Sequence, residues 1–140
     1  MRKRLFLLLL AFISLCQMYA VERTKLNFNG GWLLKVGDFQ GAELANYKDA
    51  GWKQITLPRA FNETEAFKVS IEHLSDTIMW YRKHFHIQEV GDRKYFIEFE
   101  GVRFGADIWL NGKKVGYTEN GVMASGFDLT PYIIKGENVI

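Results

Sequence analysis

Cysteine and proline are scarce in this sequence, whose 140 residues include one cysteine, Cys16, and two prolines. Cys16 falls within the first twenty residues, which form a separate segment, so residues 21–140 contain no thiol. This absence excludes a disulfide framework, a cysteine nucleophile and a thiolate metal site from that part of the chain. Stability must come from a hydrophobic core, and aromatic residues, at 15 %, supply the material for one.

The first twenty residues have the pattern of a secretory signal peptide. Residues 2–4 are basic, residues 5–15 form an apolar run, and Ala20 is a small residue at a suitable cleavage position. A retained membrane anchor would need ~20 apolar residues, and this run is shorter and interrupted. Lipid attachment at Cys16 is another alternative, but a bulky leucine precedes that cysteine. We expect cleavage of residues 1–20, a periplasmic or secreted chain, and no membrane contact after cleavage.

The chain also lacks an excess of charge of one sign. Three of its eighteen basic residues stand at positions 2–4, which leaves fifteen basic residues against sixteen acidic ones after cleavage, a net charge of −1. Binding to a phosphate backbone requires a basic face, and no continuous basic stretch supplies one. The composition therefore argues against a nucleic-acid partner.

Turn-forming residues recur at short intervals, and the segments between them are rich in aromatic and β-branched residues. This pattern predicts an all-β sandwich. One helical turn is expected within residues 42–48, and residues 59–79 form a long connection that is either functional or a cap over one end of the fold. The expected strands cover residues 27–35, 52–57, 80–87, 95–100, 106–110, 114–117 and 127–129.

Residues 111–112, Asn-Gly, give the most specific local prediction. Both residue types tolerate the positive φ angles of a type I′ turn, so residues 106–117 are expected to form a β-hairpin.

The last fifteen residues combine a turn with the start of a strand. Thr130 and Pro131 have the form of an N-cap and a first helical position, and Gly136 would end that turn. Residues 138–140 then begin an apolar extended segment with no evident partner. The sandwich is therefore expected to be incomplete at its C-terminus.

Two carboxylates share one face of an expected strand. Glu98 and Glu100 stand two residues apart, nearly 7 Å at ~3.3 Å per residue, a spacing that superficially suits a glycosidase. The better interpretation is that Ile97 and Phe99 point inward and that both glutamates line the solvated face.

His84 and His86 also share a strand face, and they could hold a metal if a third ligand such as His73 came near. Nothing in the spacing identifies that third ligand. We therefore expect a solvated face or hydrogen-bonded histidines at an interface, and neither a metal site nor a cofactor.

Aromatic and loop residues offer possible contacts to a sugar. Tryptophan rings can stack on sugar rings, but most of the four tryptophans are expected in the core; they are Trp32, Trp52, Trp80 and Trp109. The long connection carries polar side chains able to bind hydroxyl groups, namely Arg59, Asn62, Glu63, Glu65 and His73.

Five ordered sequence blocks resemble the N-terminal sugar-binding domain of family 2 glycoside hydrolases, the family of β-galactosidases, β-glucuronidases and β-mannosidases. The similarity covers roughly residues 26–140, with Trp32 and the Ile-Thr-Leu-Pro stop at residues 55–58 upstream. The blocks are Trp-Tyr-Arg-Lys at 80–83, Phe-Glu-Gly-Val at 99–102, Ala-Asp-Ile-Trp-Leu-Asn-Gly-Lys-Lys-Val-Gly-Tyr at 106–117, Phe-Asp-Leu-Thr at 127–130 and Gly-Glu-Asn at 136–138.

The resemblance implies a jelly-roll β-sandwich of the galactose-binding-domain type over residues 21–140. In the family an immunoglobulin-like domain and a (β/α)₈ barrel follow, and the barrel supplies both catalytic carboxylates. The resemblance thus implies no catalytic residue within this chain, which would be a truncated piece lacking its barrel. Its expected partners are a carbohydrate and that barrel; the oligomeric state stays open.

The implied reaction of the intact enzyme is hydrolysis of a terminal β-glycosidic bond with retention, with β-galactosidase as the leading specificity and β-glucuronidase next. Family members use a loop after the Pro stop to approach the active site, so Asn62 and Arg59 are the expected substrate-binding residues. Arg59 stands where many members have His, and residues 120–122 depart from the usual paired glycines with Tyr. A stand-alone carbohydrate-binding module and a purely structural docking domain are the alternatives.

Overall fold

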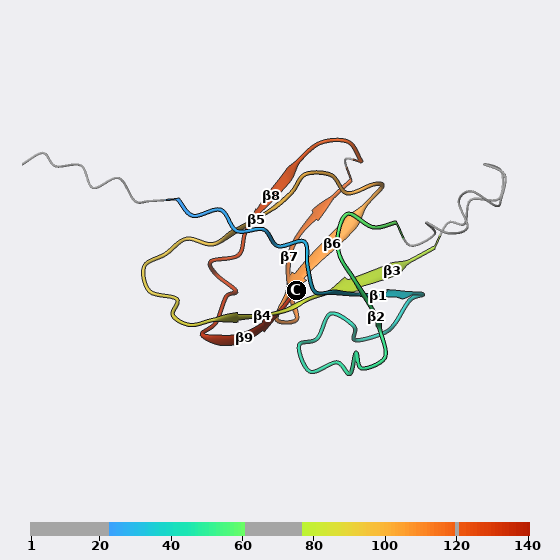
Figure 1. Cartoon of the computed structure of the whole chain (residues 1–140), viewed down its shortest axis with the longest axis horizontal. Coiled ribbons are helices and arrows are strands. Elements are labelled where there is room, and N and C mark those ends of the chain that lie inside the picture. The colour runs from blue at the N-terminus through green and yellow to red at the C-terminus, as the bar shows by residue number, and fades with distance from the viewer. Residues whose placement is uncertain (1–22, 61–76, 120) are drawn as a thin grey trace, which may run out of the picture.

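The computed structural model describes residues 23–60, 77–119 and 121–140. Within these ranges the chain forms nine strands and no helix, which confirms the all-β prediction (Figure 1). No helix in this part of the chain could cross a membrane. The strands are β1 (Trp32–Val36), β2 (Lys53–Ile55), β3 (Met79–Arg82), β4 (His84–Ile87), β5 (Phe96–Phe99), β6 (Ala106–Leu110), β7 (Lys113–Thr118), β8 (Ser125–Asp128) and β9 (Gly136–Val139).

Several predicted features lie outside the described residues. They are the signal peptide with Cys16, and Asn62, Glu63, Glu65 and His73 of the long connection.

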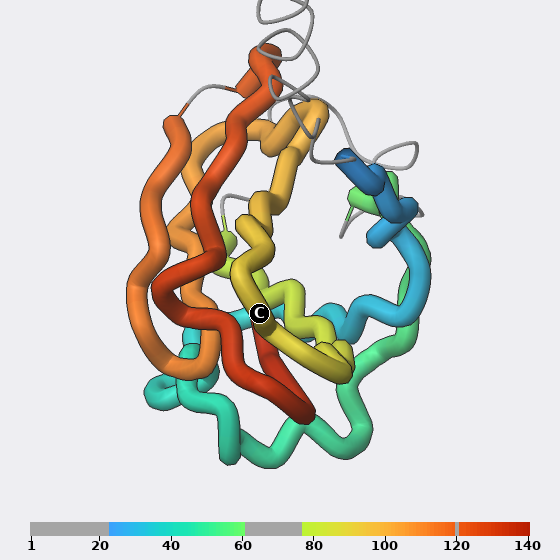
Figure 2. The backbone as a smooth tube through the Cα atoms, turned by 90° about the vertical axis from the view of Figure 1, so that its left-hand side faces the viewer, coloured from blue at the N-terminus to red at the C-terminus, as the bar shows by residue number. Residues whose placement is uncertain are grey.

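The strand pairs are nested inside one another. β6 pairs with β7, β5 with β8 and β4 with β9, each antiparallel, while β1 pairs with both β2 and β3. The segment from β4 to β9 is thus one long hairpin whose tip lies between β6 and β7. Such a hairpin rolled around a common interior gives a jelly roll, and Figure 2 shows the backbone closing around that interior.

The hairpin predicted at residues 106–117 is confirmed, with β7 ending one residue later at Thr118. Asn111 has a φ of 54° and Gly112 a φ of 80°, as a type I′ turn requires. The register shifts between Ile108 and Trp109, so that β7 contributes one extra residue, Val115, as a bulge.

The prediction of a single strand over residues 80–87 is wrong. β3 ends at Arg82, which pairs with Leu33 of β1, and β4 starts at His84, which pairs with Val139 of β9. Between them, Lys83 exchanges two backbone hydrogen bonds with Ile140, at 2.8 and 3.0 Å. The chain passes from one sheet to the other at Lys83 while its backbone groups remain bonded, so no glycine or proline marks the break.

The expectation that the last strand has no partner is also wrong. β9 pairs along its length with β4, and its far side is met by the hairpin tip. There, the Asn111 backbone N–H donates to the Val139 carbonyl at 2.8 Å, and the Asn111 side-chain oxygen accepts from the Val139 N–H at 2.9 Å.

Residues 42–48 contain turns instead of a helical turn. The backbone bonds here span three residues, from Leu44 to Gly41 and from Tyr47 to Leu44, at 3.0 and 3.1 Å. These i to i−3 hydrogen bonds belong to separate turns, and they do not continue into the i to i−4 pattern of an α-helix.

A single turn does follow β8, but Thr130 is not its N-cap. The Thr130 hydroxyl accepts from the Tyr95 N–H at 2.9 Å, and the Asp128 carboxylate accepts from the Thr130 N–H at 2.8 Å. The turn closes with the Ile133 N–H donating to the Leu129 carbonyl at 3.0 Å. Thr130 therefore ties this turn to β5.

Two groups of buried side chains form the interior. Phe28, Phe99 and Ile140 pack against both groups and join them into one core. The first group is Ile97, Leu110, Leu129 and Ile133, and the second is Trp32, Leu34 and Ile55.

Candidate functional site

A shallow pocket of about 390 Å³ lies along β2, one of the two edge strands of the three-stranded sheet. Its lining combines two cationic side chains, Lys53 and Arg59, with an amide and a hydroxyl; the full lining is Gly31, Lys53, Gln54, Ile55, Thr56 and Arg59. Amide and hydroxyl groups bind sugar hydroxyls, and two cations favour a carboxylate. Of the two expected substrate-binding residues, the structure places Arg59 at this pocket, while Asn62 lies outside the described residues.

The backbone at Arg59 is fixed by a contact from β3. The Tyr81 hydroxyl donates to the Arg59 carbonyl at 3.0 Å. Burial raises the pKa of Tyr81 above its ordinary value, so the phenol keeps its proton and remains a donor. The chain just after the Leu57–Pro58 stop is thereby attached to the sheet.

Sequence reasoning did not single out Lys53, Gln54 or Thr56 as site residues. Lys53 and Gln54 are both exposed on β2, and Ile55, which ends the strand, is buried. The polar residue types at 53, 54 and 56 were the available signal, but they do not show that Gly31 lies beside these residues. That proximity depends on the pairing of Trp32 with Ile55.

Glu98 and Glu100 lie on the solvated face, as predicted. Their side chains are 46 % and 88 % exposed, while Ile97, which precedes Glu98 on β5, is buried. The Lys25 amine lies 3.7 Å from Glu98 and 4.0 Å from Glu100. The two carboxylates therefore share a surface cation and line no enclosed site.

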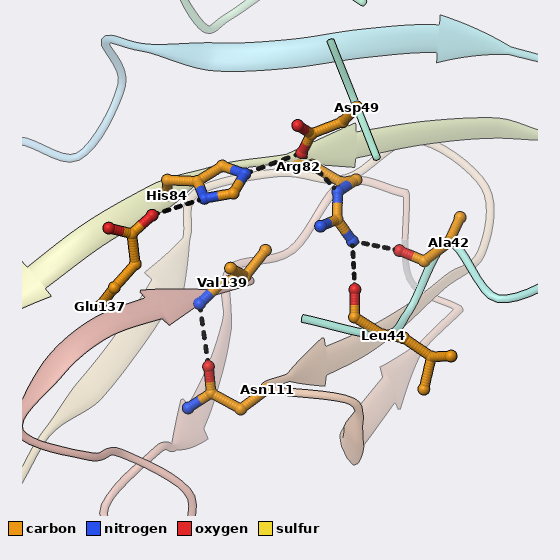
Figure 3. A network of polar contacts seen from close by, with 8 residues as sticks. All are labelled: Ala42, Leu44, Asp49, Arg82, His84, Asn111, Glu137 and Val139. Atoms are coloured by element: carbon orange, nitrogen blue, oxygen red, sulfur yellow. Dashed lines mark hydrogen bonds and ion pairs between the residues drawn. The ribbon is translucent and has the colours of Figure 1, made fainter. Parts of the chain in front are cut away.

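His84 and His86 both lie on the exposed side of β4, as expected. Within the described residues no group of three or more His, Cys, Asp or Glu side chains is arranged to hold a metal ion. The imidazole of His84 instead contacts two carboxylates. Its Nε2 lies 2.7 Å from Asp49 Oδ2, and its Nδ1 lies 2.9 Å from Glu137 Oε1 (Figure 3).

Asp49 connects His84 to a buried arginine. Arg82 is 2 % exposed; its Nε donates to the same Asp49 oxygen at 2.9 Å, and its Nη1 donates to the carbonyls of Ala42 and Leu44. The Arg82 Nη2 has no hydrogen-bond partner in the part of the chain that the structure describes. Arg82 thus anchors the turns between β1 and β2 to the sheet.

The tryptophans are largely structural. Trp32 and Trp52 are 4 % and 7 % exposed, as expected for core residues. Trp80 and Trp109 are half-buried, and their rings lie 5.4 Å apart at 33° to each other. Each of these two rings covers the other, which leaves less ring surface for a sugar.

The nested antiparallel strands define a jelly-roll domain, and the polar pocket lies at one edge of it. Comparison with known proteins identifies its family. The model for the sugar binding domain of glycosyl hydrolases family 2 matches residues 37–140. The chain therefore belongs to glycosyl hydrolase family 2, through the sugar-binding domain of that family, and the predicted jelly-roll sandwich is confirmed.

Relatives and a solved structure carry two activity names. A β-glucuronidase of Formosa agariphila is 39 % identical over 127 residues, which is 85 % of this chain and 13 % of that protein. A β-galactosidase of Thermoanaerobacter pseudethanolicus is 36 % identical over 121 residues, 84 % of this chain and 16 % of that protein. The structure of a β-glucuronidase from glycoside hydrolase family 2 matches with a TM-score of 0.73 at 33 % identity, over 86 % of this chain and 14 % of that one. The chain thus spans 13 to 16 % of the length of these proteins.

Proposed function

We propose that this chain is the N-terminal sugar-binding domain of an exported glycoside hydrolase that cleaves terminal β-glycosidic bonds with retention. The family match over residues 37–140 carries the proposal. A retaining glycosidase needs two carboxylates about 5–5.5 Å apart on either side of one sugar bond. The exposed Glu98 and Glu100 do not suit that role, so both carboxylates would come from a following barrel.

The domain would act by positioning the sugar. Arg59 and Asn62, together with Lys53 and Thr56 of the pocket, would extend the sugar subsite of the neighbouring barrel. Residues that hold the substrate in the reactive orientation raise the rate of hydrolysis even though they take no part in breaking the bond.

A terminal β-glucuronide is the first candidate substrate and a β-galactoside the second. A β-glucuronide carries a carboxylate that a β-galactoside lacks, and Lys53 and Arg59 would provide the charge to hold it. The relative with 39 % identity is named a β-glucuronidase and the relative with 36 % a β-galactosidase. This order reverses the one expected from the sequence blocks.

Export rests on the signal-like residues 1–20. The mass of the secreted or periplasmic protein tests it. A mature N-terminus at residue 21 would support cleavage of the signal peptide. A lipid on Cys16 would show instead that the protein is anchored to a membrane, and an intact Met1 would refute both cleavage and lipid attachment.

The activity test uses the polypeptide that carries this chain in its source genome. We expect turnover of nitrophenyl β-glucuronide with retention, read from the first anomer seen by NMR, and no turnover by residues 21–140 alone. Arg59→Gln should lower kcat/KM for the β-glucuronide more than for the β-galactoside. Exposed Arg103→Gln is the matched control.

Three results would contradict the proposal. Turnover by the isolated chain that survives Glu98→Gln and Glu100→Gln would show that the active site was placed wrongly. Sugar binding by a polypeptide that ends with this domain would favour a stand-alone carbohydrate-binding module. No sugar affinity together with an unchanged Arg59→Gln enzyme would leave only a structural docking role.

A further inference from the structure

One imidazole joins three segments of the sandwich. His84 of β4 contacts Asp49, from the turns between β1 and β2, and Glu137 of β9, at 2.7 and 2.9 Å (Figure 3). Each ring nitrogen of His84 therefore faces a carboxylate oxygen. The His84 side chain is 36 % exposed, so the contacts lie where a proton from solvent can reach them.

Whether His84 can hydrogen-bond to both carboxylates depends on the protonation state of its imidazole ring. A carboxylate only accepts hydrogen bonds, and a neutral imidazole has a hydrogen on one of its two nitrogens. The imidazolium can donate to Asp49 and Glu137 together, whereas the neutral ring must turn a lone pair toward one of them. Both contacts therefore exist as hydrogen bonds only when His84 is protonated.

The charged groups around His84 favour that protonated state. Burial alone would lower the pKa of His84, but the hydrogen bonds and charges of Asp49 and Glu137 outweigh it, and the pKa lies above its ordinary value. Burial would likewise raise the pKa of Asp49, but His84 and Arg82 hold it below its ordinary range. The other neighbour on β4, His86, lies directly opposite Glu137 in the β4–β9 register.

We propose that His84 is a proton-operated clasp that ties the β1–β2 turns to β9. The contact to Asp49 is the firmer one, because Arg82 Nε also holds that carboxylate at 2.9 Å. The Glu137 side chain is 67 % exposed, and His84 is its one ion-pair partner among the described residues. Loss of the proton therefore leaves the Nε2–H on Asp49 and releases Glu137, so the clasp opens on the β9 side.

The direction of the pH effect follows from the raised pKa of His84. A group with a raised folded-state pKa contributes stability that is complete below its unfolded pKa, about 6.5 for histidine, and is lost as pH rises through the folded pKa. The clasp is thus closed in mildly acidic solution and open in alkaline solution.

The first measurement is the NMR titration of the histidine rings in the 140-residue chain. The sequence has three histidines, so His84→Gln and His86→Gln assign the signals. We expect the pKa of His84 to exceed about 6.5 and to fall in Glu137→Gln, because the neutral amide no longer stabilises the imidazolium. A wild-type His84 that titrates at or below about 6.5 overturns the proposal, whatever the variants do.

The second measurement is Tm against pH. His84→Gln should lower Tm by about 4 °C or more near pH 5.5 and by progressively less toward pH 9. His86→Gln, on the same strand and face, is the matched control and should show no such trend. The same pH profile for both variants would refute the clasp and leave His84 as an ordinary surface contact.

Discussion

Replacement of Asn138 by alanine should destabilise the domain more than any surface change on β9. Asn138 is fully buried, at 0 % exposure, and its side chain makes four hydrogen bonds. Its Oδ1 accepts from the Ile134 N–H and from Asn111 Nδ2, both at 2.9 Å. Its Nδ2 donates to the carbonyls of Ile134 and Gly136, at 2.8 and 3.1 Å.

The magnitude follows from these four contacts. A hydrogen bond contributes about 1 kcal/mol net, and a buried group left without a partner costs about 1–3 kcal/mol. Asn138→Ala leaves the Ile134 N–H and two carbonyls without their side-chain partner, so we expect a loss of about 3–5 kcal/mol in the free energy of unfolding. Domains are typically stable by about 5–15 kcal/mol, so this loss is a large part of the total.

The assay is urea unfolding of the chain followed by tryptophan fluorescence at constant pH. Asn29→Ala is the control, because Asn29 is exposed; its free energy of unfolding should stay within about 0.5 kcal/mol of wild type. The slope against urea should be equal for the three proteins. A loss below about 1 kcal/mol for Asn138→Ala would refute the reasoning, since the four hydrogen bonds of a fully buried side chain would then contribute less than one ordinary hydrogen bond.

Two further changes test the packing and the acid side of the stability curve. Gly116→Ala should cost about 1–3 kcal/mol in thermal unfolding, because the new Cβ would lie 2.4 Å from the Phe127 ring. Gly126→Ala is the control, because its new Cβ would lie 3.9 Å from the nearest atom, the Ile97 carbonyl oxygen; equal Tm values for the two variants would contradict the prediction. Asp49→Asn should cost about 3–5 kcal/mol near neutral pH by leaving the Arg82 charge without its carboxylate. Because the pKa of Asp49 is lowered in the folded state, its carboxylate stabilises the wild-type domain above the unfolded pKa, and this stability is lost as pH falls through the folded pKa. The Tm of Asp49→Asn should therefore fall less steeply than that of wild type as the solution is acidified. Parallel curves of Tm against pH for the two proteins would contradict this.

Local turn chemistry and alternation could be read from the sequence. Asn111 and Gly112 adopt positive φ because their residue types tolerate it, and this decision needs no distant contact. The alternation at Ile97 and Glu98 likewise gave the buried and solvated faces of β5 correctly. Features fixed within a few residues were therefore predictable.

Features fixed by distant pairing were not predictable. Strand-forming residues continue past Lys83 with no glycine or proline to mark a break, and the break there exists because Ile140 bonds to Lys83 from the far end of the sequence. Thr130 has the sequence context of an N-cap, but its hydroxyl accepts a hydrogen bond from the Tyr95 backbone N–H instead. Asp49 lies among turn residues with no periodic signal, and its role depends on Arg82. In each case a non-local partner decides between local alternatives.

The blocks that carry the family resemblance meet in space at the end of the rolled hairpin. Asn111 of the Trp-Leu-Asn-Gly block donates from Nδ2 to Asn138 of the Gly-Glu-Asn block, at 2.9 Å, and to the Tyr132 carbonyl at 3.0 Å. Its backbone and side-chain oxygen also hold Val139. The hairpin tip is therefore bonded to the last strand of the same hairpin, which closes the roll. These residues are accounted for by closure of the sandwich, so the chemistry of sugar recognition is better sought at the β2 edge, where Lys53 and the fixed backbone of Arg59 line the pocket.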